Sequence, residues 1–261
     1  MPPLSEHEHR DELVVAAVAI GWGTLGPIVR WVSLPAVAIV FGRCVIGAVT
    51  LWAWRGARDR NRSPLAGATR GRVVASGAVL AVHWSTMFVA LERAPVGVVI
   101  LVIYLAPVFI ALAAPLIGEQ VRPTTWLALA IAVVGTVLVA DPGGDIGSGV
   151  WWALGSSVAY AVVVLVDKTL AAEVGGLRLA NSKLAVAGVL LLPLVVWADP
   201  LWSEASWGWL IVLGVVHTAF GLAVILDVLG RIPATVAAVL LYLEPASAVL
   251  FGWWWLGEQP T

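Results

Sequence analysis

Charged residues are scarce in this chain. Asp, Glu, Lys and Arg make up 12% of its 261 residues, about half the share in a soluble domain, whereas 61% are hydrophobic. A soluble protein of this size would need far more polar residues to cover its cores. The composition therefore predicts a protein that is embedded in a membrane.

Cysteine and the short motifs of common enzymes are also scarce or missing. The single cysteine, Cys44, excludes a disulfide framework and a cysteine-based metal site. The sequence has no His-Glu-x-x-His, no Gly-x-Ser-x-Gly, no phosphate-binding Gly-Lys-Ser/Thr and no Cys-x-x-Cys. We therefore expect a protein that is not an enzyme and that binds no cofactor and no metal.

A secretory leader is not predicted either. The segment Met1–Glu12 is acidic, lacks a basic n-region and is not followed by a small-residue cleavage site. We expect the first apolar block to be a retained helix.

Long apolar blocks fill the rest of the chain. Most are long enough for a helix to cross about 30 Å of hydrocarbon. Their apolar runs are continuous rather than alternating, which favours helices over a membrane barrel. The sequence thus predicts an all-α integral membrane protein with nine transmembrane helices. The predicted spans are Leu13–Val29, Pro35–Trp54, Val73–Leu91, Val96–Ile117, Trp126–Ala140, Gly149–Val166, Leu184–Ala198, Trp207–Leu226 and Ala234–Leu256.

Arginine sets the predicted orientation. The loop Arg55–Arg72 holds six arginines and one acid, Asp59, so we place it in the cytoplasm, where it also contacts anionic lipid rather than nucleic acid. Alternation then puts twelve basic residues inside and only Arg30 and Arg93 outside. The inside set comprises Arg10, the six loop arginines, Arg122, Lys168, Arg178, Lys183 and Arg231. This bias predicts a multi-pass protein of a bacterial inner (cytoplasmic) membrane with a cytoplasmic N-terminus.

One stretch of fifteen residues occurs twice. Arg93–Pro107 and Arg231–Pro245 are identical at six of fifteen positions without gaps, and each is followed by Gly-Glu-Gln. Five predicted spans separate equivalent helices, an odd number, so the two copies must have opposite orientations. Inverted repeats are common in secondary transporters, whose substrate site lies near the midplane between the halves. Duplication for assembly alone, as in a structural bundle, is the alternative.

These motifs resemble the EamA-like family of the drug/metabolite transporter superfamily. The resemblance rests on Tyr-Leu-x-Pro followed by Gly-Glu, present twice, on Glu244-Pro245 and on the membrane arginine Arg43. It implies a ten-helix bundle of 5+5 inverted repeats that moves small metabolites, commonly outward. Residues 1–140 would form the first repeat and residues 141–261 the second. Because the chain stops at Thr261, without room for a tenth helix, we expect a C-terminally incomplete sequence; a nine-helix protein is the alternative.

Four polar side chains lie deep inside predicted spans, namely Arg43, His83, His217 and Glu244. Each is about 8 to 10 residues from a span end, roughly 12 to 15 Å at the helical rise, and hence near the midplane. A charge at that depth demands a partner or a water-filled cavity. The shared depth predicts a substrate-binding or coupling site there.

Arg43 and Glu244 are the charged members of this predicted site. Arg43 could bind a carboxylate or phosphate, pair with Glu244, or satisfy backbone carbonyls between packed helices. Glu244 could take up and release protons, because burial disfavours the charged form of a carboxyl group, or form a static ion pair with Arg43. Pro107 and Pro245 each remove a backbone donor, which predicts a kink beside the cavity in each copy.

Six further residues complete the predicted site: His83, His217, Tyr104, Tyr242, Trp22 and Tyr160. The histidines could relay protons or simply pack between helices. The tyrosines recur by symmetry and could line the cavity or form interhelical hydrogen bonds. Trp22 and Tyr160 lie in the first helix of each half, beside small residues that permit close helix approach, and could face substrate.

Together these patterns favour a secondary transporter. No ATP-binding motif is present, so an ion gradient, with protons as the first candidate, or a downhill substrate gradient must drive it. The expected partners are a small-molecule substrate such as an amino acid or a related compound, membrane lipid and protons; a homodimer is left open. The competing hypotheses are a non-transporting membrane scaffold or sensor and an intramembrane hydrolase that uses His83 or His217.

Overall fold

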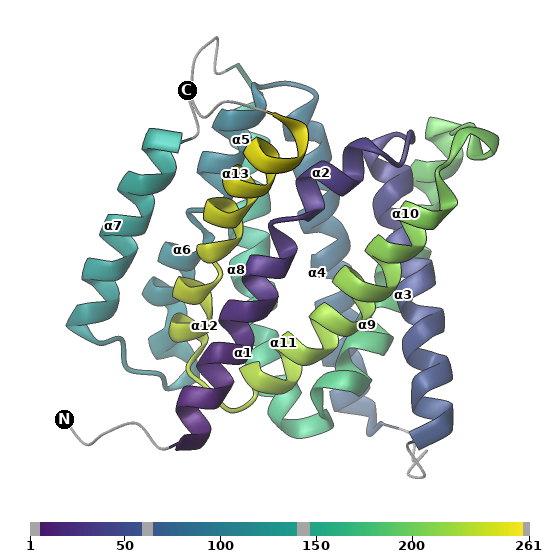
Figure 1. The fold of residues 1–261 in the computed structure, drawn as a ribbon. Coiled ribbons are helices and arrows are strands. Elements are labelled where there is room, and N and C mark those ends of the chain that lie inside the picture. Colours follow the sequence, from purple (N-terminus) through teal and green to yellow (C-terminus); the bar gives the residue numbers. More distant parts are fainter. Residues whose placement is uncertain (1–5, 59–64, 140–146, 258–261) are drawn as a thin grey trace.

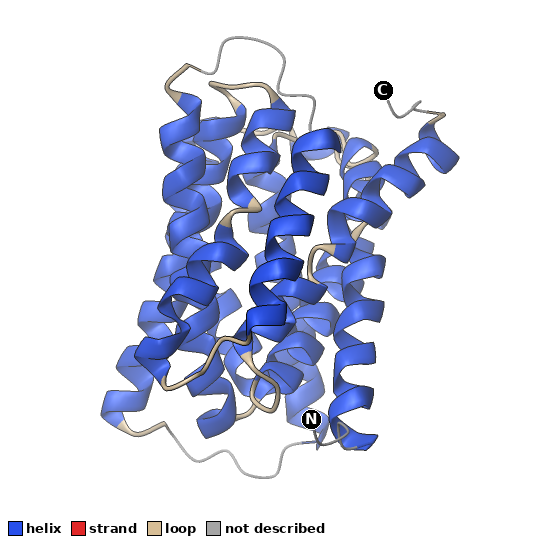
Figure 2. Ribbon diagram, turned by 90° about the vertical axis from the view of Figure 1, so that its left-hand side faces the viewer, coloured by secondary structure: helices blue, strands red, loops and turns tan. Residues whose placement is uncertain are grey.

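The computed structural model describes residues 6–58, 65–139 and 147–257. Over these residues the chain is a bundle of helices without any strand (Figures 1 and 2). Eight helical segments are long and apolar enough to cross a membrane, and one shorter apolar helix accompanies them. The predicted all-α membrane fold is therefore confirmed.

The first repeat contains four of these spans and the shorter helix. The elements are α1 (Glu6–Trp22) with α2 (Leu25–Arg30), α3 (Ala36–Arg58), α4 (Gly67–Leu91), α5 (Val96–Ile103) with α6 (Ala106–Ala113) and the 3₁₀ turn η1 (Ala114–Ile117), and finally α7 (Pro123–Val139). The fifth predicted span corresponds to α7, which includes the shorter apolar helix Pro123–Gly135.

The second repeat contains the other four spans. The elements are α8 (Gly149–Val174), α9 (Gly176–Ala198), the turn η2 (Trp202–Glu204), α10 (Trp207–Val212) with the π-helical segment η3 (Leu213–Phe220) and α11 (Gly221–Leu229), and α12 (Ala234–Leu240) with α13 (Leu243–Leu256). A π-helix is rare and is found mostly as a single turn, frequently at a functional site.

The two repeats run through the bundle in opposite directions. We call the end of the molecule at which α1, α4, α7 and α12 begin the N-face; it lies at the bottom of Figure 1. The segment α5–α6 runs towards the N-face, whereas its counterpart α12–α13 runs away from it. The most extensive packing joins the repeats, α4 against α8 and α3 against α9. The predicted inversion is therefore confirmed.

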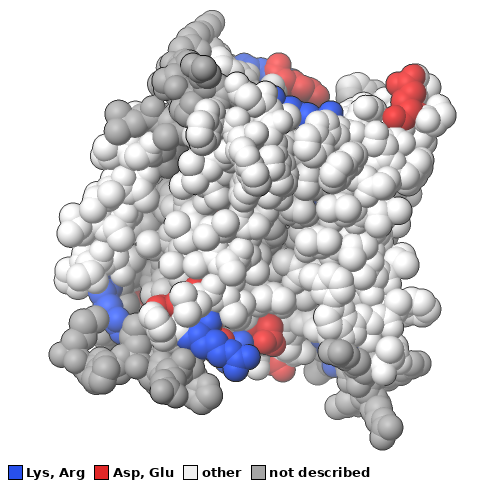
Figure 3. Space-filling view, viewed as in Figure 1, with Lys and Arg blue, Asp and Glu red and all other residues white. Residues whose placement is uncertain are grey.

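The surface matches a bundle surrounded by lipid. Charged side chains lie at the two ends of the view in Figure 3, with a wide uncharged band between them. Many large apolar side chains are exposed along this band, including Val49, Ile131, Val189 and Leu250. In water such a surface would drive aggregation, whereas lipid is as apolar as the side chains themselves.

One charge does not lie where the sequence analysis placed it. Lys183 was counted among the cytoplasmic loop residues, but α9 begins at Gly176, so Lys183 lies inside a span with only 1% of its side chain exposed. Its Nζ donates to Asp167 of α8, whose other carboxylate oxygen accepts a 2.5 Å hydrogen bond from Ser76 Oγ of α4. The correction has a physical cause: hydropathy ends a predicted span at a lysine, whereas a buried partner allows the helix to continue past it.

We predict that this buried ion pair is expensive to break and cheap to replace. Lys183→Met alone should lower the free energy of unfolding by about 3–5 kcal/mol, because it leaves the Asp167 carboxylate without its cation. The double variant Lys183→Met/Asp167→Leu should recover most of that loss. Denaturant or thermal unfolding of the purified protein in detergent measures both effects, with the exposed Arg122→Gln as control. A single variant as stable as the parent protein would contradict the prediction.

Candidate functional site

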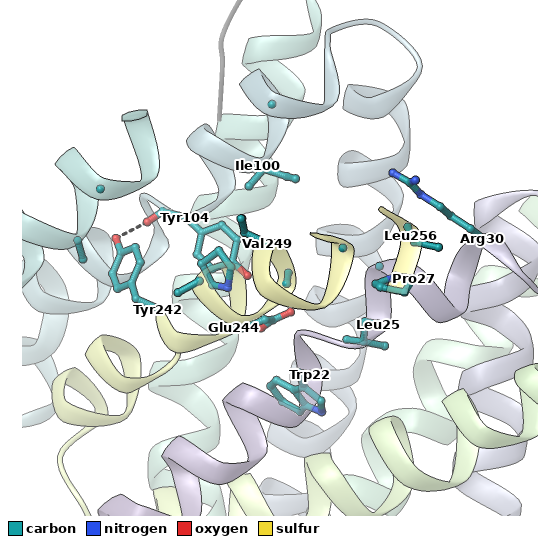
Figure 4. Close-up of a pocket in the computed structure, with 18 residues that line it drawn as sticks. Trp22, Leu25, Pro27, Arg30, Ile100, Tyr104, Tyr242, Glu244, Val249 and Leu256 are labelled. Atoms are coloured by element: carbon teal, nitrogen blue, oxygen red, sulfur yellow. Dashed lines mark hydrogen bonds between the residues drawn. The ribbon is translucent and has the colours of Figure 1, made fainter. Parts of the chain in front are cut away.

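A cavity of about 650 Å³ lies between the repeats on the side away from the N-face (Figure 4). The lining residues Trp22, Tyr242 and Glu244 lie near the middle of their spans, while Arg30 and Leu256 end α2 and α13. The cavity therefore runs from the midplane to the face opposite the N-face. Its lining comprises Trp22, Leu25, Gly26, Pro27, Arg30, Gly97, Ile100, Tyr104, Ala132, Gly135, Tyr242, Glu244, Pro245, Ala246, Ala248, Val249, Gly252 and Leu256.

Glu244 provides the carboxyl group of this lining. It is the second residue of α13, directly after the break from α12. The Tyr104 phenol points towards the Glu244 carboxyl in Figure 4 and interacts with it. The charge of Arg43 and the phenol of Tyr160 also interact electrostatically with this carboxyl. The group thus lies at the floor of a largely apolar cavity, next to a hydroxyl and near a guanidinium.

The two spans that contain Pro107 and Pro245 are each interrupted just before that proline. The first breaks between Ile103 and Ala106, and the second between Leu240 and Leu243. Pro107 cannot donate to the Ile103 carbonyl, which instead accepts a 3.1 Å hydrogen bond from Ser157 Oγ. The break thus exposes backbone carbonyls that side chains of the other repeat satisfy.

The two symmetry-related tyrosines lie at these breaks and meet across the repeats. The Tyr242 hydroxyl donates to the Tyr104 carbonyl at 2.5 Å, and the two ring centroids are 5.9 Å apart. The symmetric counterpart of Glu244 is Ala106, so only the second repeat offers a carboxyl group for a tyrosine hydroxyl. Tyr104 therefore faces Glu244, whereas Tyr242 binds backbone. The sequence symmetry is thus broken at the position that places a carboxyl group beside the break.

Trp22 and His217 come together although they are 195 residues apart. The Trp22 Nε1 donates to the His217 carbonyl at 2.9 Å. The His217 Nε2 lies 2.7 Å from Thr24 Oγ1, which itself donates to the Gly21 carbonyl at 2.8 Å. These contacts join the helix break after Trp22 to the π-helical segment η3.

His83 and Tyr160 form the counterpart of this pair in the other half. The ring centroids of His83 and Tyr160 are 5.0 Å apart. The His83 Nδ1 lies 2.9 Å from the Ser156 carbonyl oxygen, and Ser156 Oγ donates to the His83 carbonyl at 3.0 Å. In each half the histidine thus contacts an aromatic residue and a hydroxyl from the first helix of the other repeat. Neither histidine belongs to the cavity lining.

Arg43 is held away from the cavity. Its Nε donates to Thr218 Oγ1 at 2.9 Å, and Thr218 Oγ1 in turn donates to the Leu213 carbonyl at 2.8 Å within η3. Among the described residues, Arg43 forms no ion pair with Glu244 within 4.0 Å and does not line the cavity. The direct ion pair between Arg43 and Glu244, one of the alternatives considered from the sequence, is not formed. The Arg43 guanidinium donates to the Thr218 hydroxyl instead.

Of the predicted site residues, five therefore line one cavity: Trp22, Tyr104, Tyr242, Glu244 and Pro245. The other five, Arg43, His83, His217, Tyr160 and Pro107, are not part of its lining. The apolar wall of the cavity, which includes Leu25, Ile100 and Val249, was not predicted from the sequence. Apolar residues that line a cavity and apolar residues that face lipid have the same sequence signal. In the described part of the chain, no three His, Cys, Asp or Glu side chains are grouped to hold a metal ion.

The fold and this cavity define a membrane transporter, and comparison with known proteins agrees. The profile of the EamA-like transporter family matches residues 10–140 and again residues 147–261. The chain belongs to the EamA-like transporter family.

Individual relatives are distant but cover nearly the whole chain. An uncharacterized transporter of Archaeoglobus fulgidus is 27% identical over 252 residues, which are 96% of this chain and 89% of the relative. A probable terminal-alkyne amino-acid exporter of Streptantibioticus cattleyicolor is 27% identical over 249 residues, with 92% and 78% covered. A solved crystal structure superposes with a TM-score of 0.82 at 22% identity, covering 96% of this chain and 90% of the other, which shows the shared fold.

The break after Trp22 yields a prediction on packing. A Cβ at Gly23 would lie 2.1 Å from Ser247 Oγ and 2.7 Å from the Ala248 backbone nitrogen, so α1 and α13 approach too closely for a side chain. Gly23→Ala should therefore lower stability by about 1–3 kcal/mol through overpacking. Thermal unfolding in detergent measures the loss.

The matched control is Gly21→Ala, two residues away, where a Cβ would meet no atom within 4 Å. Since alanine is the better helix former, Gly21→Ala should be neutral or slightly stabilising. Equal stability of the two variants would disprove the close approach.

Proposed function

We propose that this protein is a secondary transporter that exports small amine-bearing metabolites, such as amino acids, in exchange for protons. The observation that carries the proposal is Glu244, a carboxyl group at the floor of a 650 Å³ cavity between two inverted repeats. A carboxyl group at mid-membrane depth is energetically costly, so such residues are rare and usually mark a substrate or ion pathway. Sites near the midplane between repeats are typical of secondary transporters.

The orientation follows from the positive-inside rule. The arginine-rich segment 55–72 joins α3 to α4 at the N-face, so this face is cytoplasmic in our proposal. The cavity then faces the outside of the cell, and the structure corresponds to the outward-open state of an alternating-access cycle. Because α1 begins at the same face, a cytoplasmic N-terminus is part of the same proposal.

The cavity chemistry favours a substrate with a protonated amine. Glu244 supplies an anion, and the rings of Trp22, Tyr104 and Tyr242 can surround a cation through their π faces. The remaining wall is mostly aliphatic and suits an apolar side chain. A volume of 650 Å³ is within the range of small-molecule sites. The relative that carries the name of an amino-acid exporter supports the same class of substrate.

Glu244 also provides a route for coupling. In the inward-open state the carboxylate would bind the substrate ammonium, and in the outward-open state it would take a proton and release the substrate. With either a proton or an ammonium group on Glu244, the Glu244 carboxylate itself would not cross the membrane as an uncompensated charge. An inward proton gradient would then drive export.

We predict that Glu244→Gln abolishes proton-driven export while leaving the fold intact, because the amide keeps the shape of the side chain but cannot ionise. The measurement is the flux of labelled amino acids in proteoliposomes under an imposed pH gradient, with thermal unfolding to check the fold. The exposed Glu92→Gln serves as the matched control and should retain parental flux. Parental flux in Glu244→Gln would remove this residue from the mechanism.

A further inference from the structure

We propose that Glu119 is the centre of a latch that joins the two repeats at the N-face and closes the cavity from that side. The proposal rests on the proposed alternating-access transport, in which this face must open at another stage. No role in substrate binding is assigned to Glu119, which lies at the end of the bundle away from the cavity lining.

The first observation is the position of the Glu119 carboxylate. Its two oxygens accept hydrogen bonds from the Ala234 backbone amide at 2.9 and 3.1 Å, and Lys168 Nζ lies 3.8 Å away. Ala234 begins the span α12–α13, so its amide has no partner within the helix. Gly118, with φ +81°, reverses the chain after η1 and directs Glu119 at the other repeat.

Lys168 ties a third element to the same point. Its Nζ donates to the Ile232 carbonyl at 2.8 Å and to the Gly230 carbonyl at 3.3 Å, in the segment between α11 and α12. The end of η1, the lower part of α8 and the start of α12 are thereby joined around one carboxylate. Glu119 is the only member of this group that belongs to the first repeat, so its loss would remove this polar link between the repeats.

Two further contacts join the repeats at the same face. Arg231 donates from Nε and Nη2 to the Asp11 carboxylate at 2.8 and 3.0 Å, and Arg72 donates to Glu173 at 2.7 Å. The carboxylates of Asp11 and Asp227 raise the pKa of Arg231, so this charge persists at any physiological pH. Among the ion pairs formed between described residues, those that join the repeats all lie at the N-face.

Solvent exposure ranks these contacts. The side chains of Arg72 and Glu173 are 47% and 42% exposed, so water screens this pair strongly. Arg231 is 50% exposed although its partner Asp11 is only 16% exposed, so water screens this pair in part. The side chains of Glu119 and Lys168 are only 15% and 18% exposed. The hydrogen bonds from the Ala234 backbone amide to the mostly buried Glu119 carboxylate are charge-assisted, and water has little access to compete for them. Glu119 should therefore hold the face closed more than the surface pairs do.

The test measures opening of the N-face directly. In a Cys44→Ser background, a reporter Ala238→Cys lies one helical turn above Ala234, at a position that is 1% exposed. The rate at which a soluble maleimide labels this thiol in purified protein reports how often the face opens. Adding Glu119→Gln should raise the rate about tenfold, as expected when charge-assisted hydrogen bonds are lost.

Two companion variants make the result specific. Asp227→Asn removes an ion pair with Arg231 at the same face but within one repeat, so the labelling rate should not change. Ala234→Pro removes the amide that Glu119 accepts from, at a first helical position where proline is tolerated, and should raise the rate as Glu119→Gln does.

Unchanged labelling in both Glu119→Gln and Ala234→Pro would overturn the latch, and so would an equal increase in Asp227→Asn. The assay needs no substrate, so a failure here is distinct from a failure of the proposed amine export. The latter would appear as parental flux in Glu244→Gln with the labelling pattern intact.

Discussion

A polar group within lipid must find its partner inside the protein, and this constraint shapes the whole site. The breaks before Pro107 and Pro245 release backbone carbonyls in the middle of two spans. At the Pro107 break, hydroxyl groups of the opposite repeat satisfy these carbonyls, as Ser157 does for Ile103 and Tyr242 does for Tyr104. At the Pro245 break, the Leu241 carbonyl accepts a hydrogen bond from the Glu244 backbone amide. The broken helices therefore cannot separate freely from their neighbours. They meet at the midplane, where Tyr242 and Glu244 both line the cavity.

The inverted repeat is used in two ways. It is kept in the support of the site, where each histidine rests on an aromatic residue and a hydroxyl from the other repeat, His217 on Trp22 and Thr24, and His83 on Tyr160 and Ser156. The symmetry is broken in the site itself, where Ala106 occupies the position in the first repeat that is equivalent to Glu244 in the second. A single carboxyl group gives the cavity one anionic end. One proton or one ammonium can then occupy it at a time, which is what an exchange cycle requires.

Much of this arrangement could be predicted from the sequence. The ungapped offset between Tyr104 and Tyr242 predicted the inversion, and span depth alone placed Glu244 near the midplane. Hydropathy could not predict that Lys183 is buried, because the partners that permit it, Asp167 and Ser76, come from other helices. The partner of Arg43 was also out of reach. Thr218 has no distinctive sequence signal, and its position depends on the π-helical turn.

The latch at the N-face shows the same limit. Glu119 is recognisable as part of a repeated Gly-Glu-Gln, but its partner is the backbone amide of Ala234, and a backbone group carries no sequence signal. The distribution of charge over the two faces could be read from the arginines, whereas the pairing of individual charges required the folded chain. The candidate residues at the midplane were thus predicted from the sequence, whereas the contacts at the N-face were not.

If Glu244 binds either a proton or the amine of a substrate, as we propose, then substrate binding must release protons, and these can be counted. Titration calorimetry of the purified protein with amino acids, in buffers that differ in ionisation enthalpy, gives the number of protons released for each substrate bound. We expect the parent protein to release up to one proton for each substrate bound. This number should rise as the pH is lowered, because Glu244 then carries a proton before the substrate binds. Glu244→Gln should release none. Substrate binding without proton release at any pH at which the protein is folded, or the same release in Glu244→Gln, would contradict it.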